Sequence, residues 1–116
     1  MDPSVLEELV DVLAEVRDLP TVVEGKNDKR ALEKVGFTNV IEIGGPLFRT
    51  VEELEGHDEV AILTDLDDAG KELYHYFFSE LSRRGVKINN KARIALFKTG
   101  LRQVEGLTRY LERQIT

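Results

Sequence analysis

The stretch VAILTDLDDAG, residues 60–70, decides the fold. Its first part is a nearly continuous apolar run, as expected of a strand in a parallel sheet whose two faces are both buried. Two aspartates, Asp65 and Asp67, follow this run, and Gly70 closes the stretch. Asp68 is expected to cap a helix that runs to about residue 84. The stretch therefore predicts a strand, an acidic loop and a helix, in that order.

The same order recurs on both sides of this stretch. Further strands are expected at residues 21–23, 40–43 and 94–97, and helices at about 27–35, 46–54 and 103–114. An amphipathic helix is also expected over residues 3–17, ahead of Pro20, which prevents its continuation. Alternating strands and helices predict an α/β, Rossmann-like three-layer sandwich with about four mainly parallel strands.

Length and composition limit the class of protein. In 116 residues we expect a single domain, with residues 1–19 as an N-terminal helix and residues 20–116 as the core. The chain has no cysteine and two histidines, which excludes disulfides, thiolate nucleophiles and cysteine-rich or three-histidine zinc sites. No apolar run approaches the ~20 residues of a membrane span, and the N-terminus does not resemble a signal peptide. We therefore expect a cytoplasmic protein with no membrane partner.

Charge is unevenly distributed along the chain. The net charge of −6 argues weakly against a nucleic-acid partner, yet residues 83–113 carry nine basic and two acidic side chains. This basic stretch has two interpretations, which the sequence leaves open. It forms one edge of a phosphate-binding surface, or it consists of ordinary solvated helix faces.

Polar loops follow three of the four expected strands: EGKND (residues 24–28), DLDDAGK (65–71) and KTG (98–100). In an open parallel sheet, ligands bind beyond the carboxyl ends of the strands, so these loops are expected to share one edge. Helix capping explains one acid per loop but not both Asp65 and Asp67, whose like charges repel in a tight turn. Carboxylate oxygens from Asp65, Asp67 and Glu24 suit Mg²⁺, with Mn²⁺ as a substitute.

Two motifs in this order resemble the Toprim domain: TVVEGKND (residues 21–28) and ILTDLDDAG (residues 62–70). Type IA and type II topoisomerases, bacterial primases, recombination-mediator proteins, OLD-type nucleases and the ribonuclease that matures 5S rRNA share this domain. The resemblance covers about residues 20–100. It implies that Glu24 acts as general acid or base, and that Asp65 and Asp67 bind Mg²⁺.

Departures from the family pattern indicate which group of Toprim proteins the sequence resembles most. Type IA topoisomerases have a further acid where this chain has Ala69, so the motif is closer to the primases and the 5S rRNA maturation ribonuclease. A topoisomerase also needs a nucleophilic tyrosine on a separate domain, and a primase needs a zinc module and a polymerising subdomain. Neither fits in 116 residues. The continuation Lys26-Asn27-Asp28 fits small nuclease-like Toprim proteins.

The leading expectation is Mg²⁺-dependent phosphodiester chemistry on RNA or DNA, as a nuclease, with protein partners or a homo-oligomer left open. Candidates to bind substrate phosphates are Gly25, Lys26, Gly70, Lys71, Lys98 and Arg102. A non-catalytic nucleic-acid-binding or assembly module is the alternative. A third is a DxD-type phosphatase similar to haloacid dehalogenases, although those enzymes have Thr or Val where Ala69 stands. No P-loop sequence is present, which excludes a P-loop nucleotidase.

Overall fold

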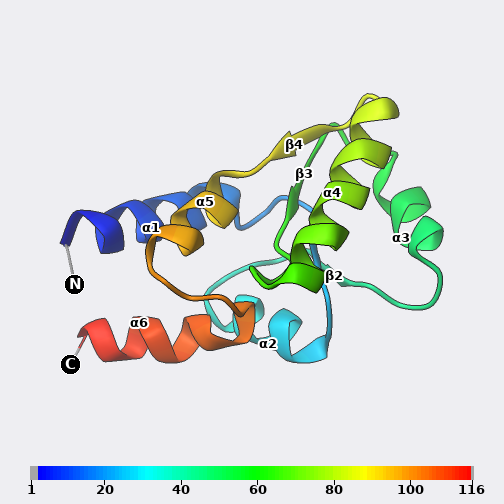
Figure 1. The fold of residues 1–116 in the computed structure, drawn as a ribbon. Coiled ribbons are helices and arrows are strands. Elements are labelled where there is room, and N and C mark those ends of the chain that lie inside the picture. Colours follow the sequence, from blue (N-terminus) through cyan, green and yellow to red (C-terminus); the bar gives the residue numbers. More distant parts are fainter. Residues whose placement is uncertain (1–2, 116) are drawn as a thin grey trace.

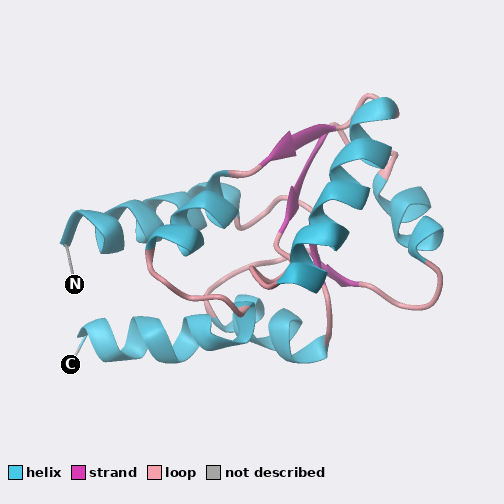
Figure 2. Ribbon diagram, in the orientation of Figure 1, coloured by secondary structure: helices cyan, strands magenta, loops and turns pink. Residues whose placement is uncertain are grey.

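Four parallel strands form one sheet in the order β2-β1-β3-β4 in the computed structural model, which describes residues 3–115 (Figures 1 and 2). The strands are β1 (Thr21–Val23), β2 (Val40–Glu42), β3 (Glu59–Ile62) and β4 (Lys87–Asn89). In the central pair, Val22 of β1 lies opposite Ile62 of β3. This register brings the carboxyl ends of β1 and β3 to the same edge of the sheet.

Six α-helices and one 3₁₀ helix connect and cover the strands within the described residues. They are α1 (Pro3–Val16), α2 (Lys26–Lys34), α3 (Leu47–Leu54), α4 (Asp68–Arg83), α5 (Lys91–Lys98), η1 (Val104–Gly106) and α6 (Leu107–Ile115). None of the helices described between residues 3 and 115 has both the length and the apolar content to cross a membrane.

Successive residues of the central strands enter different cores, as the alternation of side chains along a strand requires. Val22 and Ile62 pack with α3 and α4 on one face of the sheet. On the other face, Val23 and Leu63 pack with α1, α2 and α5. Figure 1 shows α3 and α4 to the right of the sheet, α1 and α5 to its left, and α2 and α6 below it. The three-layer α/β sandwich expected from the sequence is confirmed.

The fourth strand is not where the sequence predicted it. Residues 94–97 lie within α5, and the fourth strand is β4, in the segment that precedes α5. Ala92, Ala95 and Leu96 are buried whereas Ile94 and Phe97 are exposed, which is a helical pattern rather than that of a buried strand. A short apolar run does not distinguish the two structures, and β4 is a partly exposed edge strand without the apolar run of a central one.

Candidate functional site

Glu24 and Asp65 meet at the carboxyl ends of the two central strands. Glu24 follows β1 directly, and the backbone N–H of Asp65 donates a hydrogen bond of 2.6 Å to Glu24 Oε2. The two residues are 41 positions apart in the chain, and only the parallel pairing of β1 with β3 brings them together. This convergence is the one that the sequence predicted for the acidic loops.

Backbone N–H groups hold both aspartates of the second loop. Val104 N–H donates to Asp65 Oδ1 at 2.9 Å, and Gly70 N–H donates to Asp67 Oδ1 at 2.7 Å. Asp67 is therefore the N-cap of α4, and the expectation that Asp68 has this role is wrong. The cap falls one residue earlier because α4 already includes Asp68 in its first turn.

Gly70 is required by a close approach of two backbone segments. A Cβ atom at this position would lie 2.0 Å from the carbonyl oxygen of Asp65. The contact is tightened by the Thr64 hydroxyl, which donates to the Gly70 carbonyl at 2.7 Å. The glycine of the motif thus lets the start of α4 pack directly against the backbone that carries Asp65.

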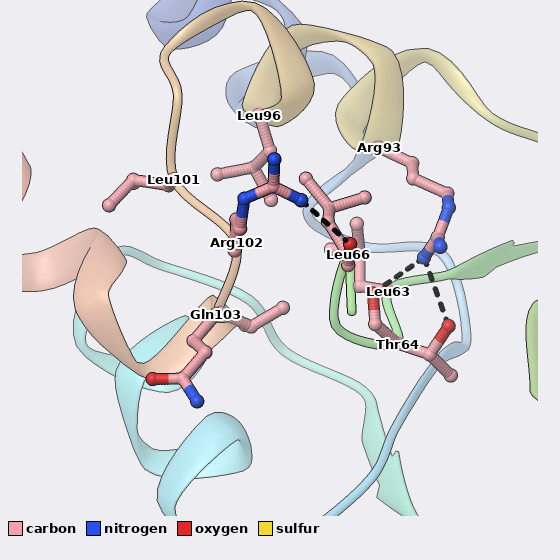
Figure 3. Close-up of a pocket in the computed structure, with 9 residues that line it drawn as sticks. Leu63, Thr64, Leu66, Arg93, Leu96, Leu101, Arg102 and Gln103 are labelled. Atoms are coloured by element: carbon pink, nitrogen blue, oxygen red, sulfur yellow. Dashed lines mark hydrogen bonds between the residues drawn. The ribbon is translucent and has the colours of Figure 1, made fainter. Parts of the chain in front are cut away.

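Two arginines, Arg93 and Arg102, donate hydrogen bonds to the backbone of residues 64–66 in the acidic loop (Figure 3). The Arg93 guanidinium donates to the carbonyl oxygens of Thr64 and Asp65 and lies 4.4 Å from the centre of the Tyr74 ring. Leu66 N–H donates to the Arg102 carbonyl at 2.7 Å, and the Arg102 side chain reaches back to Leu66 O at 3.5 Å. Burial lowers the pKa of Arg93, and the nearby Tyr74, Glu24 and Asp65 oppose that shift. Sequence reasoning does not identify Arg93 as part of the site, because its role depends on how α5 packs.

An open cleft of about 330 Å³ lies in front of this loop. Its lining comes from three segments: Glu24, Gly25, Lys26, Asn27 and Asp28 at the start of α2, Asp65, and Gln103 with Glu105 beside η1. Asp28 is 8% exposed and accepts a hydrogen bond from Gly25 N–H at 3.2 Å. It is therefore both part of the first turn of α2 and part of the acidic cluster, a role that sequence reasoning missed.

Burial and mutual repulsion raise the pKa values of three acidic side chains in the cleft. Burial and the charges of Asp65, Glu24 and Glu105 raise the pKa of Asp28 to about 6, against a weaker opposing effect of its hydrogen bond to Gly25. Burial is also the largest cause that raises the pKa of Glu24; the hydrogen bond from Asp65 N–H opposes it, and the charges of Asp65 and Asp67 each add a smaller increase. The pKa of Asp65 is raised by burial first, and then by the charge of Asp67 and Glu105. A cation near these groups would remove this repulsion.

The donor chemistry of the cleft fits a hard cation. Glu24, Asp65 and Asp67 each accept a backbone N–H with one carboxylate oxygen, and the Glu24 and Asp65 side chains also interact with each other. Within the described residues, however, no group of three or more acidic or histidine side chains is arranged to hold one ion. Mg²⁺ commonly binds through one or two carboxylates and keeps several waters, so these residues fit an open, partly hydrated site.

The structure brings only some of the predicted phosphate-binding residues to this cleft. Gly25 and Lys26 line it, and Arg102 lies beside the acidic loop. Lys71 is exposed in the first turns of α4. Lys98 belongs to α5 and forms an ion pair of 2.9 Å with Glu8 of α1, and it does not line the cleft. Its predicted place followed from the wrong assignment of residues 94–97 as a strand.

Comparison with known proteins decides the family. A sequence model described as "Toprim domain" matches residues 20–92. The chain belongs to the Toprim family. Toprim domains are modules of nucleic-acid-related proteins and generally bind Mg²⁺. The matched region contains both motifs of this Toprim domain but ends before Gln103 and Glu105, which complete its cleft.

Whole-chain relatives of this Toprim domain are archaeal and bacterial. A UPF0292 protein of Methanocaldococcus jannaschii is 33% identical over 119 residues, covering 97% of this chain and 93% of the relative. A UPF0292 protein of Pyrococcus abyssi is 30% identical and covers 90% and 80%, respectively. A solved structure of a protein from Aquifex aeolicus superposes with a TM-score of 0.76 at 33% identity, covering 86% of this chain and 95% of the other. The similarity to the Methanocaldococcus jannaschii protein covers nearly the whole chain and so extends beyond the Toprim match.

Proposed function

We propose that this protein catalyses Mg²⁺-dependent phosphodiester cleavage in nucleic acid. The observation that carries the proposal is the convergence of Glu24 with the Asp65–Asp67 loop at the ends of β1 and β3, fixed by the 2.6 Å hydrogen bond from Asp65 N–H to Glu24. Membership of the Toprim family supports nucleic acid as the substrate class. The alternative of a DxD-type phosphatase is not carried further, because the family match accounts for the same aspartates.

Asp65 and Asp67 are the proposed ligands for Mg²⁺, which when bound would stabilise negative charge on the phosphate. Backbone hydrogen bonds to Asp65 Oδ1 and Asp67 Oδ1 fix the orientation of the two carboxylates. Arg93 holds the carbonyl groups of the same loop, so the positions of both aspartates are set before any ligand binds.

Glu24 is the proposed proton carrier. One of its oxygens accepts the Asp65 N–H, which orients the carboxyl group for exchange of a proton with a substrate oxygen. Burial and the neighbouring aspartates raise the pKa of Glu24, so the group holds a proton at higher pH than an ordinary glutamate does. A carboxyl group tuned in this direction is suited to general acid–base catalysis near neutral pH.

Glu24→Gln tests the proposal because glutamine keeps the shape and the acceptor for Asp65 N–H but cannot exchange the proton. At saturating Mg²⁺, we expect turnover on single-stranded, duplex or structured RNA or DNA to fall by about 10² to 10⁴, with little change in substrate affinity. Glu42→Gln is the matched control, because Glu42 ends the neighbouring strand β2 and is exposed. Equal turnover in wild type and Glu24→Gln contradicts the proposed role of Glu24.

A non-catalytic nucleic-acid-binding module is the second candidate, and one observation favours it. Asp67 caps α4, Asp28 closes the first turn of α2, and Asp65 anchors Val104, so each of these acids has a structural role without a metal. If wild-type protein cleaves none of the RNA and DNA substrates at any Mg²⁺ or Mn²⁺ concentration, the binding module replaces the nuclease. Under that reading Glu24→Gln leaves nucleic-acid binding unchanged.

A further inference from the structure

A second groove, of about 550 Å³, lies between α2 and the segment formed by η1 and α6. One wall is a single face of α2, made of Asn27, Arg30, Ala31 and Lys34, and the other is a single face made of Glu105, Thr108, Arg109 and Glu112. Both sets have the i, i+3, i+4, i+7 spacing of one helical face. Figure 1 shows η1 and the start of α6 next to α2, and Thr108 donates to Ala31 O at 3.3 Å between α6 and α2.

The groove is continuous with the acidic cleft. Asn27, Gln103 and Glu105 line both of them. A chain-like ligand lying in the groove can therefore extend past Asn27 and Gln103 to Glu24 and Asp65 without leaving the protein surface.

The charge of the groove suits a polyanion. Its lining carries three basic side chains, Arg30, Lys34 and Arg109, and two acids, Glu112 and, at the junction with the cleft, Glu105. Among the described residues, none of the three cations forms an ion pair. In a chain of net charge −6, a groove with more basic than acidic side chains, whose three cations take part in no ion pair within residues 3–115, is a specific feature.

The basic stretch of residues 83–113, unlike the cations of the groove, forms ion pairs within the protein. Much of it is neutralised by acids of the protein itself: Arg83 and Arg84 pair with Glu80, Lys91 with Glu15, and Lys98 with Glu8. Of that stretch, Arg109 is the residue that joins the groove, together with Arg30 and Lys34 from a part of the chain that is acidic on average.

We propose that the groove between α2 and α6 binds the sugar-phosphate backbone of a nucleic-acid strand and leads it into the acidic cleft. The inference rests on the proposed function and assigns its substrate path. Arg30 and Lys34 lie one turn apart on α2, ~6 Å along the helix axis, and Arg109 is on the opposite wall. Cations spread in this way contact several phosphates of one strand rather than a single phosphate group.

The test uses a variant that carries Arg30→Gln, Lys34→Gln and Arg109→Gln. Fluorescein-labelled oligouridylate and oligothymidylate are bound in EDTA, so that nothing is cleaved, and anisotropy is followed over a KCl series. Three lost phosphate contacts on a single strand should flatten the log–log salt slope by about 2. Between ~50 and ~200 mM KCl the wild type then loses roughly 20-fold more affinity than the variant. The two oligonucleotides show whether RNA or DNA is the preferred strand.

The matched control carries Arg17→Gln, Arg49→Gln and Lys87→Gln. These three residues are exposed and line neither the groove nor the cleft, so the variant has the same change in net charge. Its salt slope should equal that of the wild type. If both triple variants flatten the slope equally, net charge alone explains the effect and the groove is overturned. In a competition experiment, oligoglutamate at equal charge concentration should not displace the oligonucleotide from the groove. If it does so in a groove-dependent way, the groove binds an acidic peptide as well as a nucleic-acid strand, and the proposal is overturned.

Cleavage assays separate this inference from the proposed function. Binding that depends on the groove, in a wild-type protein that cuts no substrate, rejects the nuclease and retains the groove. Cleavage by the groove variant with unchanged KM and kcat retains the nuclease and rejects the groove. If the nuclease and the groove are both correct, the groove variant shows a raised KM with an unchanged kcat. Glu24→Gln then shows a lowered kcat with an unchanged KM.

Discussion

Replacing Asp28 with asparagine should stabilise the metal-free protein at neutral pH. The pKa of Asp28 is raised from 3.8 to about 6, by burial first and then by the charges of Asp65, Glu24 and Glu105. A carboxyl group with a raised pKa in the folded state contributes stability below pH 3.8, and this contribution is lost as the pH rises through about 6. Above that range the group is ionised in both states, and only the folded state carries the repulsion.

The magnitude follows from the size of the shift. About 2 pKa units, at ~1.4 kcal/mol each, set an upper limit of about 3 kcal/mol. Asparagine keeps an oxygen to accept the Gly25 N–H, so the first turn of α2 retains its hydrogen bond. The cleft is open to water, which screens part of the repulsion. We therefore expect a gain of about 1–2 kcal/mol in the free energy of unfolding at neutral pH.

Urea unfolding in EDTA, from about pH 4 to about pH 8, measures this effect. The advantage of Asp28→Asn should be largest at the upper end and should vanish toward the lower end, where the wild-type carboxyl group is protonated as well. Glu33→Gln on the same helix is the control, because Glu33 is exposed and should give no pH-dependent gain. A gain that is the same at every pH, or a loss at neutral pH, refutes the electrostatic reasoning.

Two further predictions concern the acidic loop. Mg²⁺ or Mn²⁺ should raise the thermal midpoint of unfolding, by the equivalent of ~2.7 kcal/mol at a metal concentration 100 times Kd. The double variant Asp65→Asn, Asp67→Asn should abolish this response. A wild-type protein whose midpoint does not change at millimolar metal contradicts the proposed metal site. Gly70→Ala should lower stability by about 1–3 kcal/mol in calorimetry, because its Cβ would overlap Asp65 O and the overlap outweighs the ~1 kcal/mol gained in helix propensity. Ala69→Gly, an exposed change in the same turn, should instead cost no more than the ~1 kcal/mol of lost propensity.

Much of the site could be predicted from the sequence, because its central elements are local. The apolar run ahead of Asp65 and the Glu-Gly pair after residues 21–23 each identify a buried strand and its carboxyl end, and parallel strands share an edge. No long-range contact had to be known to place Glu24 near Asp65. The convergence that the structure shows through Asp65 N–H and Glu24 Oε2 follows from these two signals.

The remainder depends on tertiary contacts that leave no local signal. Asp28 has the sequence of an ordinary helix first turn, and only its burial against Asp65 and Glu105 makes it part of the cluster. Residues 94–97 are apolar enough for either a strand or a helix, and packing of α5 against α1 decides for the helix. The contact of Val104 with Asp65 spans 39 residues and was not foreseen.

The segment from Arg102 to Glu105 has a consequence for dividing the chain into fragments. Two hydrogen bonds connect it to the acidic loop: Leu66 N–H donates to Arg102 O, and Val104 N–H donates to the Asp65 carboxylate at Oδ1. A fragment ending at residue 92 would retain the complete Toprim match and both acidic motifs. It would nevertheless lose α5, with the Arg93 side chain, and one whole wall of the cleft. The boundaries of the recognisable family region are therefore narrower than those of the smallest unit that can present the site.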